Sequence, residues 1–146
     1  MAILITDAVV DEADAYFSTR LNSEAWTGSD ETEQKSALVT AANLFNAMDW
    51  IGRPATLYAA FPRYLPGYQG PVTPVHIKWA LFEQAIHLLA NPGLLIEEET
   101  VDSIVLGPVE LTTLTPVSLI PKIVKRYISN YTGSNTGAAG TWWRAN

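Results

Sequence analysis

Apolar residues recur at every third or fourth position in four stretches of the chain, which is the spacing of one face of an α-helix. The first stretch predicts a helix from about Asp7 or Asp11 to Leu21, with acidic residues near its positively polarised N-terminal end. Trp26 follows this helix and is expected to plug the core. The expected buried stripe comprises Val10, Ala13, Phe17 and Leu21.

The segment SDETEQK opens a second predicted helix. Asp30 stands at the capping position, and Glu33 three residues later completes the pattern of a capping box. The helical pattern stops at Trp50. The expected buried stripe comprises Leu38, Ala41, Phe45 and Met48.

Pro74 begins the most hydrophobic segment, PVHIKWALFEQAIHLLA, and proline is favoured in the first turn of a helix. The helix is expected to end at the following Asn-Pro-Gly. Its apolar residues form two faces, one of Val75, Trp79, Phe82, Ile86 and Leu89, the other of Ile77, Leu81 and Leu88. A helix that is apolar on two sides is central in its fold or shared with a neighbour.

The period changes after residue 96, where apolar and polar residues alternate over about Val101 to Thr115. This pattern predicts a β-hairpin or a long extended arm at about residues 96–115. Pro121 then opens a last helix carrying Ile120, Val124, Tyr127 and Tyr131. We therefore expect a mainly α fold: a small bundle of about four helices with an arm, forming one domain of residues 1–131. A flexible C-terminal tail is expected over residues 132–146.

Residues 52–74 hold five of the nine prolines and three of the nine glycines. Because proline fixes φ and removes an N–H donor, we expect an ordered loop rather than a helix or a central strand. Aromatic side chains are expected to fill space there, and Arg63 to donate to carbonyls that the loop leaves open. The residues predicted to brace the helices and present this loop for assembly with other subunits are Tyr58, Phe61, Arg63 and Tyr64, with Trp50 beside them.

Composition limits the classes to which the protein can belong. A chain of 146 residues fits one domain whose core needs no disulfide or metal. The absence of cysteine excludes disulfides, thiolate zinc sites and a cysteine nucleophile. The start of the chain lacks the basic residues of a secretory signal, and no apolar run approaches the roughly 18 residues of a membrane helix. We expect a soluble protein without a membrane partner.

The chain carries a net charge of −6. A protein that binds nucleic acid regardless of sequence gains affinity by neutralising phosphates, so an acidic chain must cluster its few bases. Only Lys122, Lys125 and Arg126 lie close together in the sequence. Their spacing would allow contact with phosphate, but three cations in the second half of an exposed helix also fit the helix dipole.

Two groups of residues suggest metal sites. His76, Glu83 and His87 form a polar stripe on the central helix that would suit zinc, but the compact His-x-x-x-His spacing is missing. A polar stripe is also what remains when two other faces are buried. The carboxylates of residues 97–99 and Asp102 would suit a divalent cation, yet they lack the alternation and glycine of a calcium loop and resemble a solvated cap.

Catalytic motifs are also missing from the sequence. It contains neither a P-loop nor a GxSxG motif, and both histidines lie on one predicted helix. We therefore expect no catalytic residue, no cofactor and no metal, and a role other than that of an enzyme.

A series of short motifs resembles a family of small tailed-phage proteins. The series runs DEADAYFSTR, AW, SALVTAANLFNAMDWIG, FPR, VTPVHIKWALFEQAIHLL, SIVLGPVEL and IPKIVKRYISNY, and covers about residues 7–131. Phage genomes often label this family DnaT-like single-stranded-DNA-binding, and its relatives by gene order and shape are head-to-tail connector adaptors. Phe61 departs from the tryptophan usual in the family but keeps an aromatic side chain.

The resemblance implies a mainly helical subunit of an adaptor ring, dodecameric in the adaptors, which lies beneath the portal and joins it to a tail or nozzle protein. Genome DNA would pass through the channel without specific binding, for which an acidic surface is suitable. The localisation implied is the head-tail junction of the virion, after assembly in the host cytoplasm. The alternative is a replication accessory protein whose aromatic residues stack the bases of single-stranded DNA.

The C-terminal tail ends in two adjacent tryptophans and an arginine, residue types that dominate binding hot spots. We expect Trp142 and Trp143 to anchor, and Arg144 to add a polar contact, in a portal groove or on a neighbouring subunit. The alternative is an unused, disordered end.

Overall fold

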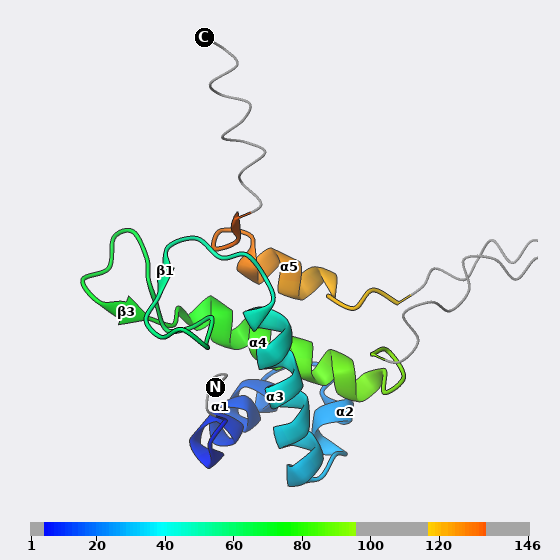
Figure 1. The fold of residues 1–146 in the computed structure, drawn as a ribbon. Helices are drawn as coiled ribbons and strands as arrows, with labels where there is room; N and C mark the ends of the chain where they lie inside the picture. The colour runs from blue at the N-terminus through cyan, green and yellow to red at the C-terminus, as the bar shows by residue number, and fades with distance from the viewer. Residues whose placement is uncertain (1–4, 96–116, 134–146) are drawn as a thin grey trace, which may run out of the picture.

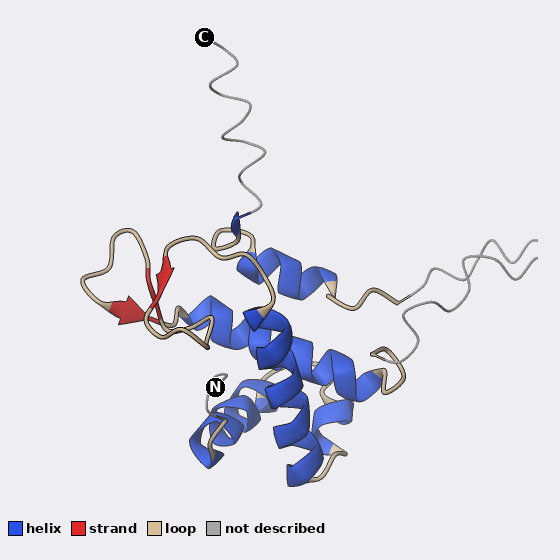
Figure 2. Ribbon diagram, in the orientation of Figure 1, coloured by secondary structure: helices blue, strands red, loops and turns tan. Residues whose placement is uncertain are grey.

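The computed structural model describes residues 5–95 and 117–133, and about half of the chain is helical (Figures 1 and 2). The expectation of a mainly α fold is confirmed. The described helices are α1 (Asp7–Ser18), α2 (Glu24–Thr27), α3 (Glu31–Asn46), α4 (Val75–Ala90) and α5 (Lys122–Ile128). Between α3 and α4 in the sequence, the chain forms a small antiparallel sheet of two-residue strands: β1 (Arg53–Pro54), β2 (Arg63–Tyr64) and β3 (Pro71–Val72).

Helix α1 buries three of the four residues expected on its inner face, Val10, Ala13 and Phe17. Leu21, the fourth, was predicted wrongly: its side chain is 85% exposed. The helix ends at Ser18, before the next turn would have brought Leu21 onto the buried stripe. Trp26, carried by the short helix α2, is almost fully buried as expected.

Helix α3 begins at the predicted capping box. The Asp30 carboxylate accepts from the Glu33 amide, and the Glu33 carboxylate accepts in return from the Asp30 amide. The two bonds satisfy two backbone donors that a helix start otherwise leaves open. Leu38, Ala41 and Phe45 are buried, whereas Met48 lies beyond the helix end and packs half-buried against the core.

Helix α4 is the centre of the fold, because α1, α2, α3 and α5 all pack against it. Figure 1 shows α5 above it and α1 and α2 below it, with α3 crossing it. Nine of its sixteen residues are buried. The predicted apolar faces are confirmed at Ile77, Leu81, Phe82, Ile86 and Leu88, whereas Trp79 and Leu89 are half-buried. The prediction that Val75 lies on a buried face was wrong. Its side chain is 51% exposed, because Val75 is the first residue of the helix.

Helix α5 follows Pro121 and buries Val124 as expected. Ile128, one turn later, is also buried and was missed by the sequence analysis. Ile120, Tyr127 and Tyr131 pack half-buried against the core. The predicted arm at residues 96–115, the acidic run that begins it and the tail beyond residue 133 lie outside the described residues.

Candidate functional site

The loop of residues 52–74 is built on a tight turn and three short strands. Strand β2 pairs with both β1 and β3, so that Tyr64 stands opposite Arg53 on one side and Pro71 on the other. Gly52 makes the turn with a φ of 75°, and any Cβ at this position would overlap the carbonyl oxygen of Tyr64. A glycine is therefore required where the chain enters the loop. The predicted ordered loop is confirmed, with a small sheet in addition.

Two aromatic residues attach the loop to the end of α3. Trp50 and Phe61 are both buried, and their rings meet edge to face with centroids 4.9 Å apart. The indole Nε1 of Trp50 donates to the Phe45 carbonyl at 2.6 Å, near the last turn of the helix. These contacts confirm that Trp50 and Phe61 brace the fold.

Arg63 fixes the loop from within. Its guanidinium donates to the carbonyls of Trp50, Ile51, Gly52 and Ala60 at distances of 3.0 to 3.3 Å. The residue is only 7% exposed, and burial lowers the pKa of the guanidinium from its usual value. The expectation that Arg63 satisfies open loop carbonyls is confirmed, and it leaves this side chain no surface for a partner.

The C-terminal part of the described chain is tied to the root of the same loop. The Ile51 amide donates to the Tyr131 carbonyl at 2.8 Å, and the Gly133 amide to the Asp49 carbonyl at 2.9 Å. Between them, Trp50 and Thr132 form an isolated antiparallel bridge. The chain after α5 thus reaches its last described residue beside the start of the loop.

The outer surface of the loop is apolar and exposed. Tyr58 and Tyr64 were expected to fill space, but they are 71% and 41% exposed, because Phe61 and Arg63 already occupy the interior. The Arg53 guanidinium lies over the Tyr64 ring, 4.5 Å from its centroid. Leu57 and Tyr68 of the same loop are 89% and 51% exposed, and neither was singled out from the sequence. We call Leu57, Tyr58, Tyr64 and Tyr68 the loop surface.

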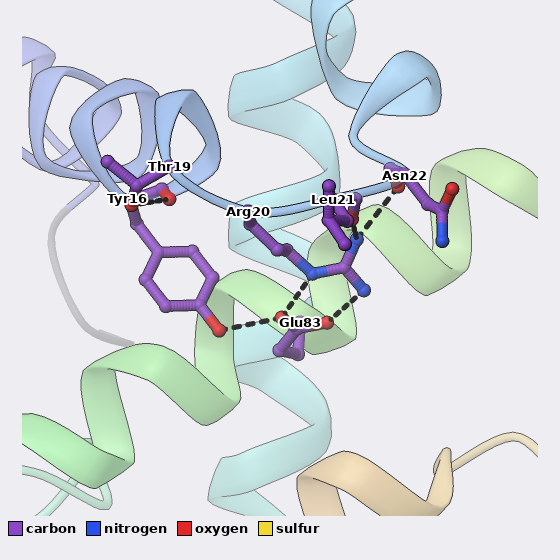
Figure 3. Close-up of polar contacts among 6 residues, drawn as sticks. All are labelled: Tyr16, Thr19, Arg20, Leu21, Asn22 and Glu83. Carbon is purple, nitrogen blue, oxygen red and sulfur yellow. Dashed lines mark hydrogen bonds and ion pairs between the residues drawn. The ribbon is translucent and has the colours of Figure 1, made fainter.

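A partly buried ion pair joins Arg20, just after the end of α1, to the buried Glu83 of α4 (Figure 3). Nε and Nη2 of Arg20 donate to the two carboxylate oxygens of Glu83 at 2.6 and 2.8 Å, and its Nη1 donates to the carbonyls of Leu21 and Asn22. The Tyr16 hydroxyl donates to the same carboxylate at 2.6 Å. Burial, followed by this bond to Glu83, raises the pKa of Tyr16.

The three residues considered as zinc ligands have separate interactions. Glu83 is held by Arg20 and Tyr16, His76 stacks on Tyr127, and His87 Nε2 lies 2.7 Å from the Ser118 carbonyl oxygen. Among the described residues, no group of three or more His, Asp or Glu side chains converges as a metal site. The stripe therefore joins α4 to its neighbours.

Most basic residues inside the described ranges have structural partners. Arg20, Arg63 and Arg53 are held as described above, Lys35 joins Asp7 and Glu31, and Lys78 joins Glu12. The exceptions are Lys122, Lys125 and Arg126, exposed on α5. Trp142, Trp143 and Arg144 lie outside the described residues.

Comparison with family models, with curated proteins and with solved structures finds no match to the chain. Within the described ranges, no helix has both the length and the apolar character required to cross a membrane.

Proposed function

We propose that the chain is a structural virion protein: one subunit of an adaptor ring in the head-to-tail connector of a tailed phage. The ring docks beneath the portal, joins it to the tail or nozzle protein and lets genome DNA pass through its channel. A dodecameric ring of identical copies follows from the resemblance of the sequence motifs to the adaptors. The role is one of assembly rather than catalysis.

The observation that supports this proposal best is the construction of the loop surface. Phe61, Trp50 and Arg63 are buried and hold the loop in place, while the large side chains of the loop surface are exposed to solvent. Exposed apolar groups that are grouped on a rigid support are typical of protein interaction sites, since little entropy is lost when they dock. A loop built in this way is suited to contact with the portal or with another subunit.

Charge also favours assembly over nucleic-acid binding. The chain is acidic, and five of the eight bases in the described ranges have partners in the fold or stack on the protein's own aromatic ring. An acidic wall lets DNA slide through a channel without binding. The acidic charge and the engaged bases support a ring through which the genome moves.

One observation favours the alternative, a single-stranded-DNA-binding protein. Lys122, Lys125 and Arg126 stand exposed on one side of α5, so they could contact successive phosphates. The loop of residues 52–74, however, supplies one exposed base beside the loop surface, Arg53, which already stacks on Tyr64. Stacking platforms work beside a basic groove, and the loop surface does not form one.

The loop surface can be tested by replacing Leu57 and Tyr58 together with serine. Both side chains are exposed, so folding should be preserved, whereas binding to the portal of the same phage should weaken by at least about tenfold. Leu21→Ser is a matched control, because Leu21 is 85% exposed on the turn after α1. Equal portal affinity of the double variant and the wild type, measured by interferometry, would refute a role for the loop surface.

The alternative, a single-stranded-DNA-binding protein, can be tested by a fluorescence anisotropy titration with labelled single-stranded DNA. At about 150 mM salt we expect no submicromolar binding, because few phosphates can be neutralised. Submicromolar affinity that is lost in Lys122→Ala with Lys125→Ala would favour the DNA-binding protein over the ring subunit.

The C-terminal tryptophans are proposed as portal or neighbour-subunit anchors. Changing Trp142 and Trp143 to alanine, or removing residues 134–146, should weaken portal binding and tail attachment while the fold keeps its helix content. Unchanged loading of the truncated protein onto the portal would show that this end of the chain is unused.

A further inference from the structure

Charged residues are divided unequally between parts of the fold. Residues 7–46, which contain α1, α2 and α3, carry eight acidic and two basic side chains, a formal net charge of −6. Residues 117–133, which contain α5, carry three basic and no acidic side chains, a formal net charge of +3. In Figure 1, α1, α2 and the start of α3 lie below α4, whereas α5 lies above it, so the described subunit has an acidic side and a basic side.

The acidic side has a defined surface on α1 and the start of α3. Asp7, Asp11 and Asp14 follow one another at spacings of four and three, so they form one exposed stripe of α1. Lys35 joins Asp7 at 2.7 Å and Glu31 at 2.8 Å, which places the start of α3 beside this stripe. The Asp7 and Glu31 side chains remain 82% and 67% exposed. We call Asp7, Asp11, Asp14 and Glu31 the acidic face.

The basic side is the outer surface of α5. Lys122, Lys125 and Arg126 are spaced by three and four residues and lie on one side of the helix, away from the buried Val124 and Ile128. None of the ion pairs within residues 5–95 and 117–133 includes them. These three residues form the basic face.

The separation of the two faces restricts how copies of the chain can associate. In a two-fold dimer built on either face, that face meets its own copy, and like charges oppose each other. In a head-to-tail contact, the basic face of one copy meets the acidic face of the next, so the first copy keeps a free acidic face and the second a free basic face, to which further copies can bind. Head-to-tail contacts close into rings when their rotation allows it.

We propose that the basic face of α5 binds the acidic face of α1 and α3 in the next copy, and that this contact joins neighbouring subunits head to tail. The inference rests on the proposed ring and adds the surfaces that form it. Charge complementarity of this kind sets orientation and partner choice and weakens as salt screens it.

The test uses two charge-reversed variants of the full chain. Lys122→Glu with Lys125→Glu changes the formal charge of the basic face from +3 to −1. Ala8→Lys, Asp11→Lys and Ala15→Lys together, all at exposed positions, change the formal charge of the stripe on α1 from −3 to +1 without removing a described ion pair. Asn43→Glu, an exposed change on α3 twelve residues beyond Glu31, controls for an added surface charge outside the two faces as defined. Circular dichroism checks that each variant keeps its fold, and native mass spectrometry and sedimentation velocity measure assembly with and without the portal.

We expect the wild type and Asn43→Glu to assemble more strongly at about 50 mM than at about 500 mM salt. Each reversed variant alone should associate about a hundredfold more weakly. An equimolar mixture of the two variants should assemble again, because the negative α5 of one variant then meets the positive α1 stripe of the other.

Three results would overturn the inference. If both reversed variants assemble as the wild type does, the subunit contact lies elsewhere, and the proposed ring itself still stands. If the mixture does not recover, the two faces are not partners of each other. If reversing the basic face abolishes single-stranded DNA binding and leaves assembly unchanged, α5 is a nucleic-acid surface. A wild type that fails to assemble even with the portal would reject the proposed function as well.

Discussion

Replacing Arg63 by methionine tests whether the loop is held from within. Methionine fills a similar space with a flexible apolar chain but offers no donor. The substitution leaves the carbonyls of Trp50, Ile51, Gly52 and Ala60 without their shared guanidinium.

The expected loss follows from the burial of these four acceptors. The bonds to the Trp50 and Ala60 carbonyls are buried, so those oxygens lose their donor in a place that water does not reach. The bonds to Ile51 and Gly52 are partly buried, so water can replace the guanidinium there. A buried acceptor without a partner costs about 1 to 3 kcal/mol. The variant no longer has to bury a charged guanidinium, which offsets part of this cost. We therefore expect the free energy of unfolding to fall by about 3 to 4 kcal/mol.

Urea denaturation, followed by circular dichroism and by tryptophan fluorescence, measures this free energy of unfolding. Arg53→Met is the matched control: Arg53 belongs to the same sheet but only stacks on Tyr64, an interaction of about 0.5 to 1 kcal/mol at an exposed site. Equal losses below about 1 kcal/mol for both variants would refute the argument, because they would show that water replaces the Arg63 guanidinium at all four carbonyls.

Three further substitutions probe other contacts by the same denaturation assay. Phe61→Ala should lower the free energy of unfolding by about 3 to 5 kcal/mol, since the side chain is fully buried; a loss below about 1 kcal/mol would contradict its bracing role. Gly52→Ala should lower it by at least about 1 kcal/mol, because alanine disfavours positive φ and its Cβ meets the Tyr64 carbonyl; an unchanged midpoint would contradict this. Tyr16→Phe removes the hydrogen bond to Glu83 and should therefore lower the free energy of unfolding by about 1 to 2 kcal/mol at neutral pH. Because the fold raises the pKa of Tyr16 above its ordinary value of 10.0, the stability from its neutral form is present below pH 10 and declines above it. The difference between wild type and variant should therefore narrow above about pH 10, and a constant difference would contradict the assigned environment.

Features set by neighbouring residues were predictable from the sequence. The capping box at Asp30 and Glu33 depends on four consecutive positions, and the structure forms both of its bonds. The two apolar faces of α4 predicted its central place, because a helix that is apolar on two sides must be covered on both. Ile128 was missed although it follows the buried Val124 by four residues, so the signal was present in the sequence.

Features set by distant residues were not predictable. Leu21 continued the apolar spacing of α1, but the chain leaves the helix after Ser18, and Arg20 then contacts Glu83, which lies 63 residues away. Nothing local identifies Glu83 as the partner of that arginine, so it was grouped with the histidines of the same helix.

The loop shows both cases together. Proline and glycine content predicted an ordered loop, and the shortage of local donors predicted the role of Arg63. Irregular backbone has no period, however, so the sequence did not show that Phe61 points inward while Tyr58 and Tyr64 remain exposed. The two tyrosines were predicted to fill space inside the loop, but they are exposed and so are available for assembly contacts.

Native mass spectrometry of the full chain mixed with the portal of the same phage decides whether the chain is a ring subunit of a connector. We predict one closed complex of fixed stoichiometry, with a dodecameric ring of the chain on the portal, that dissociates as salt is raised. A chain that stays monomeric beside the portal at every salt concentration would contradict it.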